Sequence, residues 1–335
     1  MSEKVIIIAE AGVNHNGDIE MARRMIHEAK AAGADYIKFQ TAIPELVIST
    51  YAPKAEYQKE TTGSTESQLD MCRAIHLPLS AYAELAALCR EVGIGFMSTP
   101  FDLVSIDCLV PLEMDYWKIP SGEITNLPYL RKIGALGSRV IMSTGMATLD
   151  EVAVAVDILE KAGTPRSNIS LLHCTTQYPA PYRSINLRAM DALASLGCAS
   201  VGYSDHSVGF EVSVAAVARG ARIIEKHFTL DRNLPGPDHK ASIEPDELAQ
   251  MVQAIRHIEE ALGSGEKVVA DDERPNIAIA RKSIVAARAI AAGEIFTEEN
   301  ITVKRPGDGI SPMEWDKVLG RPAPRAFSPD ELITL

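Results

Sequence analysis

The chain has 335 residues, 46% of them hydrophobic, so it can bury a large core and is long for a single domain. A net charge of −12 argues against nucleic acid or an anionic membrane as a partner, and local lysines would have to gather any anionic substrate. Five scattered cysteines, with no signal-peptide or membrane-span pattern, lead us to expect reduced thiols in a cytoplasmic protein.

Short apolar runs alternate with helical patterns from residue 5 to residue 262. The expected strands are Val5–Ala9, Tyr36–Gln40, Ile94–Ser98, Tyr116–Ile119, Val140–Met142, Ser170–His173, Ser200–Tyr203 and Ile223–His227. The expected helices are Asp18–Ala32, Gln68–Val92 with a break near Pro78, Ser105–Val110, Tyr129–Leu136, Leu149–Ala162, Leu187–Leu196, Glu211–Arg219 and Pro245–Leu262. Residues 41–67 form a long polar segment without a clear period, which is typical of a functional or mobile loop.

This alternation predicts a (β/α)8 TIM barrel. A doubly wound open sheet is the alternative, but no glycine-rich dinucleotide turn follows the first strand. We expect the barrel domain to span residues 1–262 and a charged linker to span residues 263–280.

Residues 281–335 lack the alternation of strand and helix patterns and contain short strand patterns and turns instead. They predict a small β-rich module with strands within Ser283–Ile290, at Ile301–Lys304 and at Ile333–Thr334, and a short helix at Trp315–Leu319. A module of this size buries little core, so we expect it to pack on another surface.

Two histidines end neighbouring strands of the predicted barrel. His206 and His227 are 21 residues apart, which fits one strand, one helix and the next strand. Consecutive strand ends are neighbours in such a barrel, so the two imidazoles can share a divalent metal ion. The alternative is two unrelated strand-end histidines.

Other polar side chains follow the same strands. Lys38 and Lys118 lie within apolar strands, where a lysine is costly unless it is paired with an anion. The hydroxyls that follow strands are Thr99, Ser121, Ser143, Thr175, Thr176 and Ser204, and the carboxylates are Glu10, Glu123, Glu225 and Asp238. A single hydroxyl of this kind is more often a helix cap than a ligand contact. For Glu10, an ion pair with Lys38 is as good an interpretation as a role in the site. Together they predict a phosphate and carboxylate cradle, and a metal-assisted reaction of a phosphorylated carboxylate with a carbonyl compound.

Several longer motifs resemble one family. In chain order they are IIAEAGVNHNGD, YIKFQT, STPFD, WKIPSGE, MSTGM, LLHCTTQYP, YSDHS and EKHFT. They are similar to the sialic acid synthase family, and the tail from Arg281 resembles that family's antifreeze-like (SAF, β-clip) domain. The resemblance implies condensation of phosphoenolpyruvate with an N-acetylmannosamine-type sugar, giving a nine-carbon 2-keto acid and phosphate.

The resemblance also implies roles for particular residues. His206 and His227 match the ligands of a Mn2+ or Mg2+ ion. The positions that hold phosphoenolpyruvate are Lys38, Lys118, Thr99, Ser121, Ser143, Thr176 and Ser204. The positions around the sugar and the metal-bound water are Glu10, Gln40, Glu123, Tyr178 and Asp238. Arg305 matches an arginine by which the SAF domain contacts the sugar in a domain-swapped homodimer.

One motif departs from the pattern of some neuraminate-type members. Thr176–Gln177 stands where those members have Asn-Ile before Tyr-Pro, so the preferred sugar is open. Synthases of legionaminic and pseudaminic acids, which use 6-deoxy diacetamido sugars, are the alternative within the family. A non-catalytic carbohydrate-binding barrel is the remote alternative.

Overall fold

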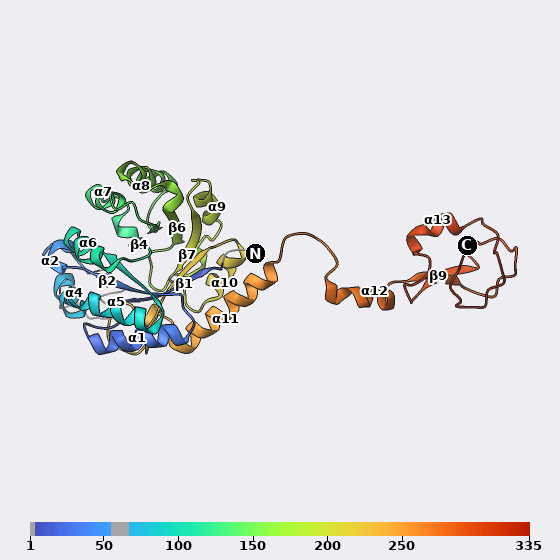
Figure 1. The fold of residues 1–335 in the computed structure, drawn as a ribbon, viewed down its shortest axis with the longest axis horizontal. Coiled ribbons are helices and arrows are strands. Elements are labelled where there is room, and N and C mark those ends of the chain that lie inside the picture. The colour runs from blue at the N-terminus through green and yellow to red at the C-terminus, as the bar shows by residue number, and fades with distance from the viewer. Residues whose placement is uncertain (1–3, 55–66) are drawn as a thin grey trace. The chain divides into compact units, whose positions relative to one another are not determined.

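The computed structural model describes residues 4–54 and 67–335. It divides the chain into two compact units, Met1–Gly263 and Ser264–Leu335. The first unit carries an eight-stranded parallel sheet surrounded by helices, and the second is small and holds a two-stranded antiparallel sheet (Figure 1).

The first unit is a (β/α)8 barrel, which confirms the predicted fold. Its strands are β1 (Ile6–Gly12), β2 (Tyr36–Thr41), β3 (Gly95–Pro100), β4 (Trp117–Ile119), β5 (Val140–Ser143), β6 (Ile169–Cys174), β7 (Ser200–Asp205) and β8 (Ile223–His227). The paired order is β3-β2-β1-β8-β7-β6-β5-β4. Because β3 also lies against β4, the sheet closes on itself.

Helices follow the strands around the barrel. They are α1 (Ile19–Ala31), α2 (Pro44–Val47), α4 (Gln68–Ile75), α5 (Ala81–Val92), α6 (Leu103–Leu109), α7 (Leu127–Gly134), α8 (Leu149–Ala162), α9 (Ala189–Ala194), α10 (Glu211–Ala218) and α11 (Pro245–Leu262). Local sequence fixes several starts: Asp18 caps α1, and Thr148 with Glu151 forms a capping box on α8. The predicted break near Pro78 is confirmed, since α4 ends before it and α5 begins after it.

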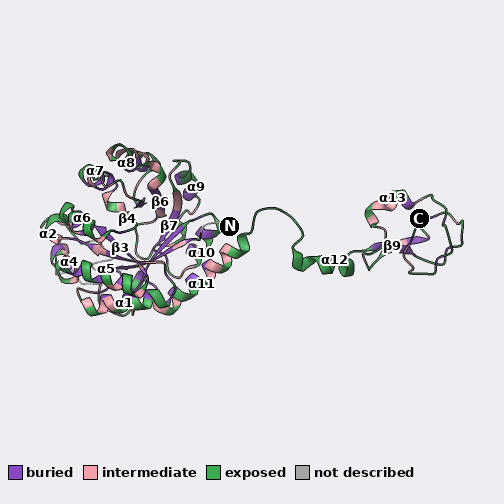
Figure 2. Ribbon diagram, viewed as in Figure 1, coloured by how far each residue is buried: buried purple, intermediate pink, exposed green. Residues whose placement is uncertain are grey.

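Alternation along the strands sorts their side chains into two environments. One set, including Ile7 and Ile37, packs in the main core between strands and helices, and Figure 2 shows the strands as buried. The other set fills the barrel interior, where Ile8, Met97 and Ile141 form an apolar layer with Leu172 and Ile223. Polar side chains lie next along the same inward-facing rows, toward the carboxyl ends of the strands, which places the site described below.

Some details differ from the sequence prediction. Helix α2 lies in the polar segment expected to lack a period, and residues 55–66 of that segment lie outside the described residues. Helix α6 begins at Leu103 because Asp102 caps it, rather than at Ser105. The expected linker contains helix α12 (Arg274–Ala280), with a proline in its first turn.

The second unit has a core of its own. Strands β9 (Ser283–Ala286) and β10 (Ile301–Lys304) pair antiparallel, and α13 (Trp315–Val318) is the expected short helix. Ile284, Phe296 and Phe327 belong to its buried cluster. The strand expected at Ile333–Thr334 is wrong, because only an isolated bridge joins Leu332 to Val285 there. The expected strand pattern to Ile290 likewise ends at Ala286, and Ile290 makes an isolated bridge to Phe327.

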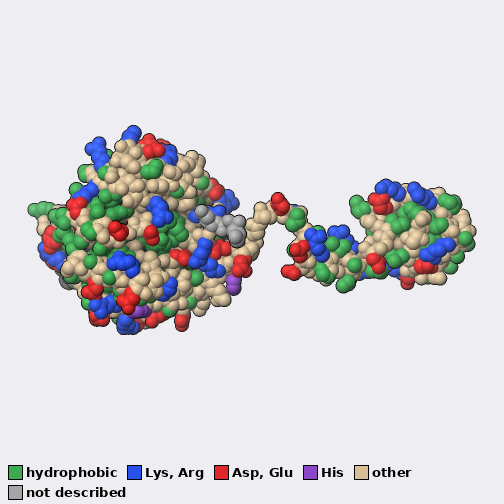
Figure 3. Space-filling view, viewed as in Figure 1, with side chains coloured by type: hydrophobic (Ala, Val, Ile, Leu, Met, Phe, Trp, Pro, Cys, Tyr) green, Lys and Arg blue, Asp and Glu red, His purple; other side chains and the backbone are tan. Residues whose placement is uncertain are grey.

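The surface carries charges of both signs. On the face that Figure 3 shows, basic and acidic side chains are intermixed over both units. Within the described ranges, no helix combines the length and apolar character needed to cross a bilayer.

Candidate active site

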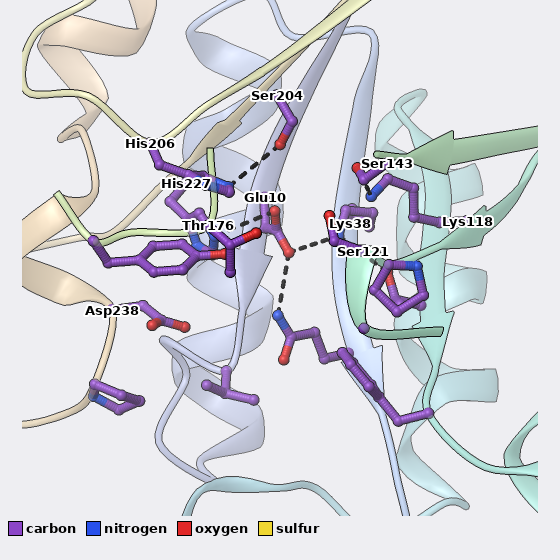
Figure 4. A pocket seen from close by; sticks show the side chains of 18 of the residues that line it. Glu10, Lys38, Lys118, Ser121, Ser143, Thr176, Ser204, His206, His227 and Asp238 are labelled. Carbon is purple, nitrogen blue, oxygen red and sulfur yellow. Dashed lines mark hydrogen bonds and ion pairs between the residues drawn. The ribbon is translucent and has the colours of Figure 1, made fainter. Parts of the chain in front are cut away.

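A cavity of about 430 Å³ opens at the carboxyl ends of the barrel strands. Every site residue named from the sequence lines it except Glu123, Thr175 and Arg305. Figure 4 shows carboxylates, lysines, hydroxyls and two imidazoles pointing into this space from different strands. The strand-end side chains that the sequence singled out are therefore brought together at one pole of the barrel.

The floor of the cavity is a row of alternating buried charges. Lys38 Nζ is 2.6 Å from Glu10 Oε1 and 3.7 Å from Glu225 Oε2. Lys118 Nζ is 3.3 Å from Glu225 Oε1, so Glu225 lies between the two lysines. Each of these side chains is almost fully buried, and each charge has an opposite charge beside it, as buried ions require.

The pairing sets the protonation of the row. Burial alone would raise the pKa of Glu10, but His227, Lys38 and Lys118 together hold it well below its usual range. Burial would lower the pKa of Lys38, but Glu10 and Glu225 raise it overall. Glu10 is therefore a carboxylate and Lys38 an ammonium at neutral pH.

Hydroxyl groups accompany the charges. Lys38 Nζ donates to Thr99 Oγ1 at 3.0 Å, Lys118 Nζ donates to Ser143 Oγ at 2.8 Å, and Ser204 Oγ donates to Glu225 Oε1 at 2.9 Å. These bonds hold lysine and hydroxyl donors close together over the floor. A phosphate or carboxylate group could accept hydrogen bonds from several of them at once.

The ends of β4, β5 and β6 approach one another closely. Gly145 N donates to Ser121 Oγ at 3.0 Å, and Ser121 Oγ lies 3.2 Å from Cys174 Sγ. A Cβ added at Gly145 would come within 2.3 Å of Thr176 Oγ1. Glycine is therefore needed here to let the Ser121 and Thr176 hydroxyls converge.

His206 and His227 face each other, with ring centroids 5.5 Å apart. His206 Nδ1 lies 2.7 Å from the Thr175 carbonyl oxygen, which can only accept, so Nδ1 carries the proton and Nε2 keeps its lone pair. Burial and His227 lower the pKa of His206 to about 3, so its ring is neutral. Tyr178 packs against both rings.

The two imidazoles are the donors that this part of the cavity would offer to a divalent metal ion. His227 Nδ1 is buried without a hydrogen-bond partner in the described structure, and His227 Nε2 lies 3.4 Å from Glu10 Oε2. Within residues 4–54 and 67–335, no group of three or more His, Cys, Asp or Glu side chains could hold a metal. The protein donors at this place would thus be the two rings, leaving the other positions to water or substrate.

The outer part of the cavity holds further polar groups. Gln40 Nε2 donates to Glu10 Oε1 at 3.2 Å, which ties the amide to the charged floor. Asp238 lies on the same side of the cavity as the two histidines (Figure 4), and burial raises its pKa. Asp238 and Glu10 are therefore two carboxyl groups whose surroundings push their pKa values in opposite directions, as an acid and base pair requires.

Three residues named from the sequence are not among the residues that line the cavity. Glu123 accepts a hydrogen bond of 2.5 Å from Asn126 Nδ2 in the turn that begins α7, and it is absent from the cavity lining. Arg305 is exposed in the second unit and donates from Nε to the Ala280 carbonyl. The Thr175 hydroxyl donates to the Ser184 carbonyl and does not line the cavity either.

Glu225 is the site residue to which the sequence prediction gave no role. The alternation of side chains along β8 could have placed it in the site. Ile223, Glu225 and His227 share the inward face, while Lys226 faces out. Helix α4 was also missed as part of the lining, to which it contributes Gln68, Met71, Cys72 and Ile75. Its pattern resembles that of any amphipathic helix that packs on a core.

Comparison with known proteins decides the family. The model of the NeuB family matches residues 25–267, and that of the SAF domain matches residues 281–335. The chain belongs to the NeuB family. This confirms the resemblance drawn from the motifs, for both the barrel and the tail.

Relatives within the NeuB family cover nearly the whole chain. The chain is 52% identical to N,N'-diacetyllegionaminic acid synthase of Campylobacter jejuni over 99% of both chains. It is 37% identical to human N-acetylneuraminate-9-phosphate synthase over 89% of this chain and 82% of that protein. A solved structure, the N-acetylneuraminic acid synthetase of Leptospira borgpetersenii in complex with citrate, superposes with a TM-score of 0.71 at 36% identity, covering 82% of this chain and 90% of that one.

Proposed function

We propose that this enzyme condenses phosphoenolpyruvate with 2,4-diacetamido-2,4,6-trideoxymannose and water to give N,N'-diacetyllegionaminic acid and phosphate. The observation that carries the choice of sugar is the 52% identity to a legionaminic acid synthase over 99% of both chains. A second protein of that name, from Legionella pneumophila, is 46% identical over 94% of this chain. These relatives support the diacetamido sugar over N-acetylmannosamine, which the motifs alone placed first.

The bond changes define what the site must do. C3 of phosphoenolpyruvate bonds to the aldehyde carbon of the sugar, and the aldehyde oxygen takes up a proton to become a hydroxyl. Water adds to C2, and breakage of the C2–O bond releases inorganic phosphate and leaves the 2-keto group. The site therefore needs an anion cradle, a proton donor for the aldehyde oxygen and a base for the water.

The cavity floor supports the assignment of the anion cradle. Lys38 and Lys118 are buried ammonium groups beside Thr99 and Ser143, and Ser121, Thr176 and Ser204 line the same floor. We assign these residues to the phosphate and carboxylate of phosphoenolpyruvate. Glu225 is the shared counter-charge that holds both lysines in place.

The carboxyl groups divide by their pKa directions. The depressed pKa of Glu10 keeps it ionised, so it would accept a hydrogen bond from the attacking water and orient it, and the raised pKa of Asp238 suits a proton donor. Burial also raises the pKa of Glu123, but that side chain is held by Asn126 outside the cavity lining. The resemblance of the motif is therefore the only support for Glu123 as a site residue. We assign Gln40 and Tyr178 to the sugar.

His206 and His227 would hold a divalent ion, which when bound polarises the sugar aldehyde as a Lewis acid. Between the two ions expected from the sequence, Mn2+ suits imidazole donors better than Mg2+, which prefers oxygen ligands. His206 is pre-set for this role, since its Nδ1 proton is held by the Thr175 carbonyl.

The mouth of the cavity supports a homodimer in which the SAF domain of one chain covers the barrel of the other. Segments that follow β2 to β7 expose large apolar side chains, namely Leu46, Tyr51, Leu103, Val104, Leu127, Met146, Leu149, Tyr182 and Val208. Such a contact would cover the apolar side chains exposed at this end of the barrel. Arg305, exposed on the SAF domain, would then offer its planar guanidinium to the sugar.

A phosphate-release assay tests the proposal. Phosphoenolpyruvate is supplied with Mn2+ and either the trideoxy diacetamido sugar or N-acetylmannosamine, and both phosphate and the nine-carbon acid are measured. We expect turnover with both and a higher kcat/KM with the trideoxy sugar. A higher kcat/KM with N-acetylmannosamine would make that sugar the substrate, as the motifs alone suggested. No phosphate release with either sugar would support a non-catalytic carbohydrate-binding barrel.

A further inference from the structure

One wall of the cavity is a single face of helix α4. Gln68, Met71, Cys72 and Ile75 line the cavity, and their spacing of three, four and seven residues places them on one side of the helix. Met71 is buried, while Cys72 and Ile75 are half-buried. The wall is thus mainly apolar, in a cavity whose floor is charged.

Core packing does not account for this face. In the described part of the chain, Met71, Cys72 and Ile75 belong to none of the barrel's buried apolar clusters, although Leu77, just beyond the helix, does. The opposite side of α4 is exposed and polar: Asp70 and Arg73 form an ion pair there at 2.9 Å. Met71, Cys72 and Ile75 are therefore turned toward the cavity.

Neighbouring groups extend the same wall. Val13, after β1, and Phe101, after β3, line the cavity as well. Burial and the nearby Asp238 raise the pKa of the Cys72 thiol to about 11, so it is a neutral, weakly polar group at neutral pH. The apolar surface thus spans the sector of the barrel between β1 and β3.

A polar group ends this wall. His76 lines the cavity, and its Nδ1 lies 2.8 Å from the Cys72 carbonyl oxygen. That carbonyl can only accept, so Nδ1 carries the proton, and burial lowers the pKa of the ring. Nε2 is then an acceptor beside the apolar surface.

The chemistry of the proposed reaction orients the sugar. Its C1 must meet C3 of phosphoenolpyruvate, which the lysines hold on the floor, so C4 to C6 form the end farthest from the floor. Helix α4 follows the carboxyl end of β2 in the chain, and its side chains line the cavity outside the charged floor. In the trideoxy sugar this end carries a C6 methyl and a C4 acetamido group.

We propose that the cavity face of α4 is a specificity-determining surface that receives the C6 methyl and the C4 acetamido group of the sugar. This inference rests on the proposed function and deepens it. The methyl groups would contact Met71, Cys72 and Ile75, and the acetamido N–H would donate to His76 Nε2. A hydroxyl on C6 would be placed against apolar atoms without a partner, which disfavours sugars that carry it.

The test compares three sugars with two near-isosteric variants, Ile75→Thr and Cys72→Ser. The sugars are 2,4-diacetamido-2,4,6-trideoxymannose, its 6-hydroxy counterpart 2,4-diacetamido-2,4-dideoxymannose, and N-acetylmannosamine. We expect kcat/KM for the trideoxy sugar to fall about tenfold in Ile75→Thr and less in Cys72→Ser, because a pocket distinguishes one methyl-sized group by about that factor. The 6-hydroxy sugar should lose little, and KM for phosphoenolpyruvate should not change.

Two control variants separate this effect from a folding defect. Ile75→Val keeps an apolar group and should keep the wild-type ratio between the sugars. Ala74→Ser changes the exposed side of the same helix and should leave every constant unchanged. Thermal unfolding midpoints of all variants show whether they are folded.

The outcomes distinguish this inference from the proposed function. Suppose that wild type prefers the trideoxy sugar, but Ile75→Thr and Cys72→Ser keep the wild-type ratio of kcat/KM between the trideoxy and the 6-hydroxy sugar. The role of α4 is then overturned and the proposed function stands. If wild type prefers N-acetylmannosamine, the proposed function falls and this inference falls with it.

Discussion

A buried ion pair behind the site offers a sharp test of how the two histidines are positioned. Lys226 Nζ is 3.2 Å from Asp205 Oδ2, and both side chains are fully buried. Each residue immediately adjoins a histidine, Asp205 before His206 and Lys226 before His227. Because neighbouring strand residues point to opposite faces, the pair ties β7 to β8 on the outside while the histidines meet on the inside.

Hydrogen bonds connect the pair to the loop after β7. Lys226 Nζ donates to the Ser207 carbonyl at 2.6 Å, and Asp205 Oδ1 accepts from Ser207 N at 2.9 Å and from its hydroxyl at 2.6 Å. Ser213 of α10 donates to Asp205 Oδ2 at 2.7 Å. The backbone on both sides of His206 is therefore held by this network.

We expect Lys226→Met to lower the free energy of unfolding by about 3 kcal/mol. Removing one partner of a buried pair costs about 3–5 kcal/mol, and three hydrogen bonds remain to Asp205, so the lower end applies. For a barrel of this size the midpoint should fall by roughly 6–12 °C. Adding Asp205→Asn removes the unpaired charge and should restore more than half of the loss, measured by thermal unfolding.

Metal affinity separates positioning from stability. Mn2+ binding is measured by the loss of the free-ion EPR signal, which does not depend on turnover. If the pair positions the histidines, the double variant should bind Mn2+ at least about tenfold more weakly even though much of its stability has returned. Lys4→Met, which breaks the exposed pair with Asp35, is the matched control and should change neither property. Additive stability losses, or wild-type Mn2+ affinity in the double variant, would refute the reasoning.

Three further predictions concern the site itself. EDTA should abolish phosphate release and Mn2+ should restore it, with His206→Ala and His227→Ala lowering Mn2+ affinity; full activity in a metal-free preparation would remove the metal assignment. Lys118→Ala should lower kcat/KM for phosphoenolpyruvate at least about tenfold, since a hydrogen bond to a charged group contributes about 1.5–3 kcal/mol, whereas a kinetically silent variant would leave Lys118 a structural residue. Arg305→Ala mixed with His206→Ala should recover activity towards about a quarter of wild type if the SAF domain acts on the partner's barrel; no recovery, with subunit exchange shown independently, would mean that it acts on its own.

The sequence predicts the barrel well because its signals are local and periodic. Each strand is a short apolar run, and β8 is found at Ile223–His227 as expected. The floor residues are also predictable, since Lys38 and Lys118 are charges inside apolar strands. What the sequence does not reveal is their mutual arrangement, in particular that Glu225 lies between both lysines.

The remaining differences have physical causes. The turn after β4 sends Ser121 into the cavity, and two residues later Glu123 bonds to Asn126, the N-cap of α7. No pattern in the sequence distinguishes a side chain used by a cap from one used by a substrate. Likewise, the spacing of Met71, Cys72 and Ile75 shows that α4 is amphipathic, but only the folded chain shows that its apolar face lines a cavity.

The charged floor explains how two lysines remain ready for an anion inside a barrel. Without Glu10 and Glu225, burial would favour the neutral form of Lys38, which binds phosphate poorly. Each ammonium has three N–H donors; Lys38 donates to Glu10 and Thr99, and Lys118 donates to Ser143. An arriving phosphate or carboxylate can therefore be bound by further donors without breaking these bonds. Glu10 and Glu225 thus keep Lys38 charged. Under the proposed function, carboxylates beside an anion site are therefore needed to keep that lysine ready for its ligand.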